Sequence, residues 1–349
     1  MLRQSLFAVA LVSMTVYLSC KGKIDGPVGG VDYDPQIPDA EELVIDVNTD
    51  ELVAEEITVT EGSVDNQAAE DLANNTIEQA DSTDLANTAA ALDQAISTDA
   101  KTYWETNESN LEALSADEDD TFIAQVQDAE AKLKANQALL AKYLPNVVAA
   151  SGGRMLTGAR FAGIEANYND DIARTSNDLC INTWIEWRED QLAPYEDVLD
   201  NALATIEGVY NTQKDKLDVS YTTQASNFET TRSNNIAKYK DLHAKAIVKL
   251  DDALSAGILS TETHGLLKGL NTIMLAVNLY YVQVNYKNSV SILNESYADA
   301  LDALEALRTK LEGEATSQFN AAKKVVEDQY NENVAKCHDQ GGTHQGTNG

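Results

Sequence analysis

The chain has few of the residue types that most often build active sites. It contains four histidines (His243, His264, His338 and His344) and three cysteines in 349 residues. None of the histidines lies in a nucleophile or metal-binding motif, and the chain has no glycine-rich phosphate loop and no nucleophile elbow. We therefore predict that the protein is not an enzyme, with no catalytic residue, no cofactor and no metal site.

Basic residues are also scarce. The chain has 25 Lys and Arg against 57 Asp and Glu, a formal net charge of −32. Much of this imbalance lies in residues 21–120, which hold 27 acidic and 3 basic residues. Because phosphate groups are bound by clustered Lys and Arg, nucleic acid and anionic lipid are poor partners for this acidic segment, and we expect no nucleic acid partner. A solvated, self-repelling surface is the simplest interpretation.

Aromatic residues make up only 6% of the chain and there are five prolines, which favours long helices with narrow apolar stripes over one thick core. The stretch from Asp178 to His338 is predicted to form two such helices. An apolar stripe with spacings of three and four continues from 201 to 254 and again from 266 to 334, slipping in register near Asn288. Residues 256–260 separate the two stripes, so the chain is expected to reverse at Gly257 and Ile258.

The cysteines fit this hairpin. The midpoint of Cys180 and Cys337 falls in the predicted turn, so an antiparallel hairpin brings both to the same height at its open end. We predict a disulfide between them, with two free thiols as the alternative. Trp184 and Trp187 are three residues apart and share a helical face, where they would form an aromatic plug beside the disulfide or, alternatively, a ligand platform.

The first twenty residues, MLRQSLFAVALVSMTVYLSC, combine Arg3 with an apolar run from Leu6 to Leu18 that ends at Cys20. The run is too short to span a membrane but is typical of an export signal. This stretch resembles a bacterial lipoprotein signal, with Tyr17 at the position where Leu, Val or Ile is usual. The resemblance implies that Cys20 is lipidated and becomes the mature N-terminus. Ordinary cleavage nearby, which would release a free secreted protein, is the alternative.

The remaining organisation follows from composition. We expect a signal peptide at 1–19, a tether and acidic segment of little structure at 20–65, short acidic Ala-rich helices at 66–120, a helical bundle at 121–338 containing the long hairpin 178–338, and a disordered tail at 339–349. The predicted fold class is all-α. Within these limits we expect strands at 43–45 and 57–60, helices at 121–144 and near 161–172, and a kink or new helix start at Pro194.

Two patterns resemble fragments of metal sites. Asp46, Asn48 and Asp50 have the spacing of the first half of a calcium loop, but Glu51 and Ile57 stand where the loop needs glycine and a bidentate glutamate. At the C-terminus Cys337, His338, Asp339 and His344 are possible zinc ligands, although nothing in the tail fixes them. We interpret the first pattern as a solvated acidic turn and the second as tail.

These observations predict an exported, lipid-anchored envelope or surface protein that serves as a helical spacer, scaffold or protein-interaction arm. Its partners would be the membrane, through the N-terminal lipid, an unidentified protein, and a second copy bound through the coiled-coil seam. The alternative is an α-helical pore-forming or membrane-perturbing protein that uses the apolar hairpin tip at 257–286. A periplasmic holdase, with an apolar cleft between its arms, is a third hypothesis.

Overall fold

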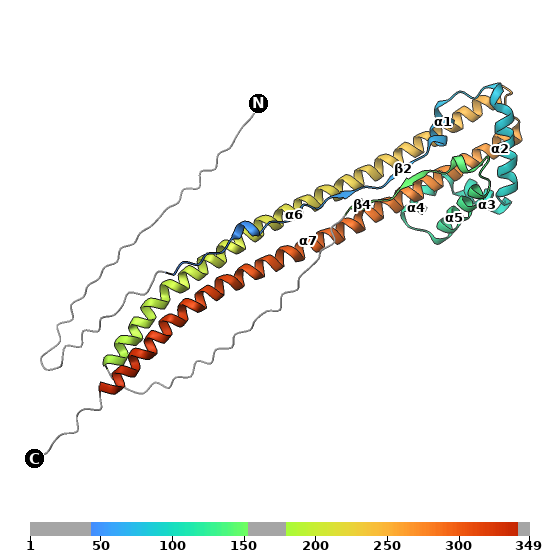
Figure 1. Cartoon of the computed structure of the whole chain (residues 1–349). Helices are drawn as coiled ribbons and strands as arrows, with labels where there is room; N and C mark the ends of the chain where they lie inside the picture. Colours follow the sequence, from blue (N-terminus) through green and yellow to red (C-terminus); the bar gives the residue numbers. More distant parts are fainter. Residues whose placement is uncertain (1–42, 153–178, 341–349) are drawn as a thin grey trace, which may run out of the picture. The chain divides into compact units, whose positions relative to one another are not determined.

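The computed structural model describes residues 43–152 and 179–340. Two helices dominate it, α6 (Leu179–Ser255) and α7 (Thr261–Gln340), which lie side by side and antiparallel (Figure 1). At 1.5 Å per residue, the 77 residues of α6 extend over about 115 Å. The predicted all-α fold with one long helical hairpin is therefore confirmed. We call the paired helices the rod, and the end that holds Leu179 and Gln340 the open end.

The rod reverses through a glycine-terminated turn. Gly257 has a φ of 72°, in the left-handed region that glycine adopts without a Cβ penalty. The N–H of Ile258 donates to the Ala253 carbonyl (2.9 Å) and that of Gly257 to the Leu254 carbonyl (3.0 Å), which is the Schellman pattern of helix ends. Ser260 then caps α7, because its hydroxyl accepts the Thr263 N–H (3.1 Å).

An eleven-residue period runs along both helices of the rod. Buried side chains on α6 occur at Trp184, Tyr195, Ile206, Leu217, Phe228, Tyr239 and Leu250, and on α7 at Asn271, Val282, Leu293, Leu304, Ala315, Val326 and Cys337. Each step of eleven forward along α6 is matched by a step of eleven back along α7. We call these fourteen residues the core columns. The predicted register slip near Asn288 is wrong, because the period holds through that position. An eleven-residue period gives 3.67 residues per turn and a right-handed supercoil, rather than the left-handed one of heptads.

Pro194 lies inside α6, which continues without a break from Leu179 to Ser255. The expected new helix start at this proline is therefore wrong. The adjacent core positions, Leu192 and Tyr195, are buried against the rod at 9% and 7% exposed. Tertiary packing on both sides of the proline thus keeps the helical path that the missing N–H alone would weaken.

Short helices surround the turn end of the rod and form what we call the head. They are α1 (Gln67–Asn74), η2 (Gln79–Asp81), α2 (Ser82–Ala95), α3 (Thr98–Asn107), η3 (Glu108–Asn110), α4 (Leu111–Ala116), α5 (Asp120–Ala135) and η4 (Ala141–Tyr143). Asn66, Ser97 and Asp119 cap α1, α3 and α5 by accepting backbone N–H groups. The predicted helix at 121–144 is shorter than expected, because the chain leaves α5 at Asn136, whose carbonyl accepts three N–H groups of the following turn.

The head buries the apolar segment that sequence placed at the tip of the hairpin. Leu267, Leu270, Ile273, Met274 and Val277 are at most 1% exposed and share one core with Trp104, Phe122 and Leu133 of the head helices. Within the described residues, no helix is both long and apolar enough to cross a membrane.

Residues 43–65 run along the rod from near the open end to the head, and we call them the strap (Figure 1). The strap contains η1 (Thr49–Glu51), β1 (Val59–Thr60) and β2 (Ser63–Asp65). Two short strands that follow the head, β3 (Asn146–Val148) and β4 (Ser151–Gly152), return along it. β1 pairs with β4 and β2 with β3, both antiparallel. The strand at 59–60 was expected; the one expected at 43–45 is not formed.

The turn allows a prediction that separates backbone strain from packing. Gly257 and Gly265 both have open space where a Cβ would be added. Gly257→Ala should cost about 1–2 kcal/mol, because an L-residue is strained at positive φ. Gly265→Ala, inside α7, should stabilise the protein by about 0.5–1 kcal/mol, since alanine is the better helix former. Thermal and urea unfolding of the two variants would check the opposite signs, and equal effects would contradict the assigned turn.

Candidate functional site

The most developed site within the described residues is the groove of the rod that holds the strap. Three glutamines contact strap backbone atoms through their side-chain amides. Gln318 of α7 accepts the Asp46 N–H (2.9 Å) and donates to the Asp46 carbonyl (2.8 Å). Gln224 of α6 accepts the Val59 N–H (3.1 Å) and donates to the Ile57 carbonyl (2.7 Å), and Gln213 accepts the Ala54 N–H (3.4 Å). We call Gln213, Gln224 and Gln318 the strap hooks.

Gln224 and Gln318 do for the strap what a neighbouring strand does in a sheet, whereas Gln213 only accepts an N–H. A primary amide carries a donor and an acceptor, so one Gln can satisfy the N–H and the C=O of an extended segment together. Directly after the strand predicted at 43–45, the backbone of Asp46 is thus bonded to a helix side chain and not to another strand. The polar stretch of α6 around residues 220–227 is therefore part of a binding groove and not a gap in the core.

Apolar side chains and one ion pair complete the attachment. Leu52, Ile57 and Val59 are 0%, 5% and 8% exposed and share a core with the rod. Lys310 pairs with Glu51 (2.8 Å), and the hydrogen bond from Lys310 lowers the pKa of Glu51. Closer to the head, Tyr239 donates to the Val64 carbonyl (2.8 Å) and Asn285 donates to the Ser63 carbonyl (3.1 Å).

The strap also passes too close to the rod for side chains at certain points. A Cβ on Gly62 would lie 2.7 Å from the Val148 carbonyl oxygen and 2.8 Å from Cγ of Asn285. A Cβ on Gly152 would lie 2.6 Å from the Thr58 carbonyl oxygen. These two glycines allow the strap and the returning strands to pack directly against α7 and each other.

The other side of the core columns carries a second set of paired side chains, which we call the clasp pairs. Arg188 lies over the Tyr330 ring (5.6 Å), Arg308 over Tyr210 (4.6 Å) and Arg232 over Tyr286 (5.0 Å), while Tyr221 packs on Tyr297 (5.0 Å). All eight residues recur at multiples of eleven along their helices. On α6, each clasp residue lies four residues after a core residue, and each hook lies four residues before the next core residue. Clasp residues and hooks therefore flank the core columns on opposite sides.

Acidic or amide side chains reinforce each clasp pair. Arg188 makes two 2.8 Å bonds to Glu327, Arg308 bonds Glu207 (3.1 Å) and Arg232 bonds Gln283 (3.2 Å). At the tyrosine pair the bonds are reciprocal: Tyr221 donates to Asn294 (2.8 Å) and Tyr297 to Asp218 (2.5 Å). The bonds from Lys214 and Tyr297 lower the pKa of Asp218, and the bond to Asp218 raises the pKa of Tyr297. A shallow hollow of about 350 Å³ lies beside this tyrosine pair.

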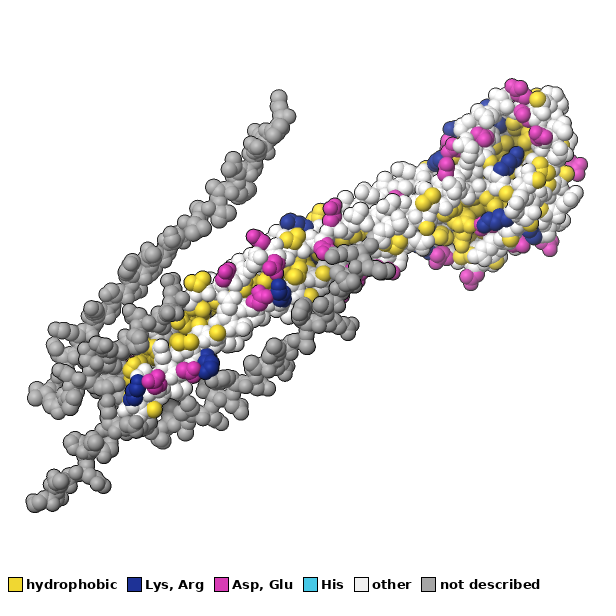
Figure 2. All heavy atoms as spheres, viewed as in Figure 1, with side chains coloured by type: hydrophobic (Ala, Val, Ile, Leu, Met, Phe, Trp, Pro, Cys, Tyr) yellow, Lys and Arg dark blue, Asp and Glu magenta, His cyan; other side chains and the backbone are white. Residues whose placement is uncertain are grey.

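Ion pairs connect the head to the rod. Glu112 pairs with Lys240 (2.6 Å), Glu70 with Lys238 (2.7 Å) and Glu118 with Lys287. His243, 9% exposed, bonds Glu108 through Nε2 (2.8 Å). Several acidic residues of the head are thus used against basic residues of the rod, which the regional charge count did not anticipate. Figure 2 shows further acidic side chains on the visible face of both the head and the rod.

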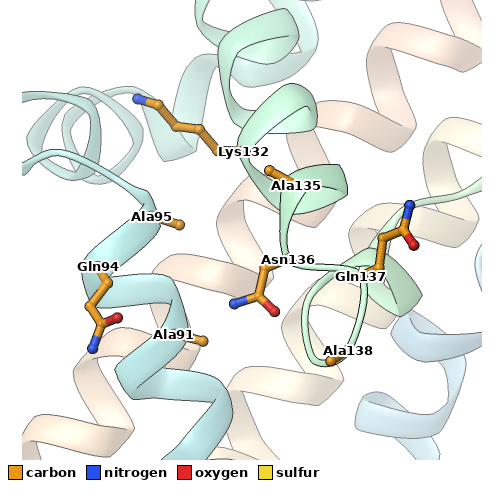
Figure 3. Close-up of a pocket in the computed structure, with 8 residues that line it drawn as sticks. All are labelled: Ala91, Gln94, Ala95, Lys132, Ala135, Asn136, Gln137 and Ala138. Carbon is orange, nitrogen blue, oxygen red and sulfur yellow. The ribbon is translucent and has the colours of Figure 1, made fainter.

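The head also has a hollow of about 470 Å³ between α2 and the end of α5 (Figure 3). Alanines line much of it, and Gln94 from α2 faces Asn136 from the end of α5 across it. Lys132 at its edge is paired with Asp128 (2.7 Å). The other residues that line this hollow are alanines and amides, which supply no acid, base or nucleophile.

The structure places the sequence-predicted sites as follows. Gly257 and Ile258 form the turn. Trp184 and Trp187 are 2% and 5% exposed and pack edge to face at 5.3 Å near the open end, so neither presents a platform to solvent. Cys337 is 5% exposed, and Cys180 lies in the first turn of α6. Cys20, the helix expected near 161–172 and the tail from 341 lie outside the described residues.

The side chains of His338, Asp339 and His344 in the zinc pattern lie outside the described part of the chain, and only the calcium pattern falls within it. There, His, Cys, Asp and Glu form no group of three that could hold a metal ion. In the calcium-like segment, Asp46 contacts Gln318 through its backbone, and the Asn48 side-chain amide donates to Glu51 (3.3 Å).

Sequence reasoning missed the hooks and the clasp pairs, although both leave a signal. Gln213 and Gln224 are eleven apart, as are Tyr210, Tyr221 and Arg232 on α6 and Tyr286, Tyr297 and Arg308 on α7. Searching for spacings of three and four finds the apolar stripe but not these columns. A search for an eleven-residue period would have shown that these polar residues recur at a fixed distance from the core columns.

A single hook can be tested by substitution. Gln224→Ala removes both bonds to the strap and should cost about 1–3 kcal/mol, because the Val59 N–H and the Ile57 carbonyl lose their partners in a part-buried site. Hydrogen exchange of the Val59 amide should accelerate in this variant. Asn227→Ala, at an exposed position of the same helix, is the matched control and should leave the strap amides protected. Equal exchange in both variants would show that Gln224 does not hold the strap.

No family model matches this chain, and neither the curated proteins nor the solved structures compared with it include a match.

Proposed function

We propose that the protein is an exported, lipid-anchored spacer of the cell envelope or cell surface, whose rod holds the head away from the membrane as a scaffold or protein-interaction arm. The observation that carries the proposal is the path of the strap. Its N-terminal part is bonded to Gln318, toward the open end, and it reaches the head only at Val64 and Asn66. An anchor upstream of the strap is therefore attached on the open-end side, opposite the head.

Chain lengths favour the same arrangement. Cys20 lies 23 residues before Leu43, so fully extended chain reaches at most about 80 Å from the start of the strap. A Gly- and Pro-containing tether of this length has a typical end-to-end distance of only about 25–30 Å. The head contacts α7 as near to the open end as Lys287, which pairs with Glu118; thirty-one residues, about 46 Å of helix, separate Lys287 from Gln318. On these lengths the head would stand well clear of an anchored Cys20.

The predicted disulfide belongs to this proposal, as a covalent clamp on the open end. In the register of the Arg188–Tyr330 clasp pair, residue 338 is at the height of Cys180, so Cys337 is about 1.5 Å away along the rod axis. We expect non-reducing digestion of the exported protein to yield one linked peptide pair containing Cys180 and Cys337. If both cysteines were recovered as free thiols, the disulfide would be wrong, and the proposal that the rod is a spacer would stand without it.

The described rod favours a monomer over the homodimer expected from the sequence. Hooks and strap cover one side of the core columns and clasp pairs cover the other. The large apolar residues exposed on α6 and α7, Val219, Val248 and Val325, are separate from one another. Light scattering during size-exclusion chromatography would measure the mass. A dimer mass would contradict the monomer and support the coiled-coil seam as an interface between two copies.

A membrane-perturbing activity remains the second candidate, because 266–282 is a long, strongly apolar segment. These side chains are the core of the head, so this activity would require the head helices to move away from α7. The third hypothesis, a holdase, needs an apolar cleft, and the hollow in the head is lined by alanines and amides instead.

The spacer proposal is tested by placing the two ends of the rod relative to a membrane. The chain has three tryptophans, one in the head and two near the open end. Acylated protein is reconstituted in vesicles containing a dansyl lipid, as Trp104→Phe, which keeps Trp184 and Trp187, or as Trp184→Phe/Trp187→Phe, which keeps Trp104. Energy transfer should be strong from the open end and weak from the head. Equal transfer from both would mean that the rod lies along the membrane and is not a spacer.

A further inference from the structure

Three parts of the chain advance along the rod in fixed proportion. The core columns repeat every eleven residues, the clasp pairs recur at multiples of eleven, and the two α6 hooks are eleven residues apart. The strap keeps pace with them: Gln213 bonds Ala54 and Gln224 bonds Val59, so eleven helix residues correspond to five strap residues. The deeply buried strap residues Leu52 and Ile57 are also five apart.

The proportion follows from elementary geometry. Eleven residues of α-helix rise about 16.5 Å at 1.5 Å each. Five residues of extended chain rise about 16.5 Å at 3.3 Å each. The rise of the strap therefore equals that of the helices over this interval. Five residues of a regular strand would reverse its face, but two consecutive exposed residues, Glu55 and Glu56, break the alternation and return Ile57 to the buried side on which Leu52 lies. Over the longer interval from Asp46 at Gln318 to Ser63 at Asn285, seventeen strap residues accompany thirty-three of α7. The tighter turn η1 takes up the excess of about 6 Å.

We propose that the rod is a length-setting device built from one repeating unit, which consists of eleven residues of α6, eleven of α7 and five of the strap. Removing or adding a whole unit should change the length of the rod by about 16.5 Å and keep the remaining units in register. This inference deepens the spacer proposal, because it states how the spacer's length is fixed. The test below measures folding and length in solution, so it succeeds or fails independently of membrane anchoring.

One unit can be cut out along the register that the clasp pairs define. The matched variant lacks 211–221 of α6, 297–307 of α7 and 54–58 of the strap. This deletion removes the Tyr221–Tyr297 pair, the hook Gln213 with its partner Ala54, and the buried residues Leu217, Leu304 and Ile57. The Tyr210–Arg308 and Arg232–Tyr286 pairs then become neighbouring clasp pairs. Gln224 keeps its bond to the Val59 N–H, and the Leu52 carbonyl, two residues before Val59 in the shortened strap, takes the place of the Ile57 carbonyl. The connection from Gly152 to Leu179 has a shorter distance to span, which costs little.

The matched variant should unfold cooperatively, and small-angle X-ray scattering should show a maximum dimension about 16 Å shorter than that of the parent. Hydrogen exchange should show the Asp46 and Val59 amides both protected. Adding a unit by duplicating the same three segments should lengthen the rod by the same amount. This second variant keeps the test decisive if the shortened rod is too unstable to study.

Two control variants depart from the repeating unit, one in the ratio of helix to strap residues and the other in the number of helix residues removed. Deleting 211–221 and 297–307 while leaving the strap intact makes the strap five residues too long, so Asp46 should lose protection while Val59 keeps it. Deleting eight residues from each helix instead of eleven turns the two ends of each helix about 80° out of phase and should abolish cooperative unfolding. The proposal is overturned if matched deletion and matched insertion both unfold no better than these controls, or if their lengths do not change in opposite directions.

Discussion

Replacing Cys20 by serine is expected to release the protein completely from membranes and to abolish acyl labelling. The reason is that the lipid is the only membrane attachment the proposal includes, since the described helices contain no spanning segment. A diacylated cysteine anchors stably, whereas serine at the same position accepts no thioether-linked lipid. Membrane fractionation after metabolic labelling with a clickable fatty acid would measure both effects in one experiment.

The chain provides a matched control for this substitution. Cys180→Ser/Cys337→Ser removes the other two cysteines and should leave labelling and membrane association unchanged. If the Cys20→Ser protein stays with membranes after a high-salt wash, another attachment must exist and the lipid-anchor proposal fails. If it is found unlabelled in the medium alongside an equally unlabelled parent, the export signal is of the ordinary cleaved type.

Trp104→Ala is expected to be the most damaging substitution in the head, at about 3–5 kcal/mol. Trp104 is 1% exposed and packs edge to face on Phe122 (6.2 Å) and Tyr103 (5.1 Å), which joins α3 to α5. The cavity left behind should loosen the head helices over the apolar residues of α7. We expect a lower denaturation midpoint and increased binding of an apolar dye such as ANS, with the helical signal of the rod largely retained.

The same variant discriminates between the two candidate functions. Under the spacer proposal, loosened head helices expose a core segment and vesicles stay intact, whereas a membrane-perturbing protein would gain leakage activity once 266–282 is accessible. Trp187→Ala, a comparable truncation near the open end, is the control and should destabilise the rod without exposing that segment. Leakage caused by Trp104→Ala and not by Trp187→Ala would favour the second candidate.

The hairpin was predictable because long helices can be recognised from the regular spacing of apolar residues along the sequence. The absence of proline from 201–254 and from 266–334, the apolar stripes, and Gly257 between them were sufficient to place both helices and the turn. Pro194 misled because a sequence window shows the lost N–H but not the packing of Leu192 and Tyr195 that offsets it. The period itself was misjudged, since spacings of three and four are common to seven- and eleven-residue repeats over one or two turns.

The head and the strap depend on contacts between residues far apart in the chain, which periodicity does not reveal. The apolar run from Leu266 to Val284 looked like an exposed tip because the helices that cover it are short, Ala-rich and individually weak. Trp104 and Phe122 gave little sign of sharing a core with Leu270. Similarly, Gln318 carries no local mark of contacting Asp46, 272 residues away. Only the repeat of Gln213 and Gln224 at a clasp-like spacing pointed to a second function for polar residues in the rod.

The hooks have a consequence for how this chain tolerates change. The hooks bond backbone N–H and C=O groups, which every residue except proline supplies in the same form. The strength of these bonds therefore does not depend on which side chains the strap carries. Outward-facing strap positions such as Val44 and Val53, 72% and 54% exposed, are thus free to drift. Proline at Asp46, Ala54 or Val59, or any side chain at Gly62, would be purged. In a saturation-mutagenesis survey, the exposed positions of the strap should therefore tolerate most substitutions. Buried Leu52 and Ile57 should accept only apolar residues, and any insertion or deletion that shifts the phase of the strap should be damaging.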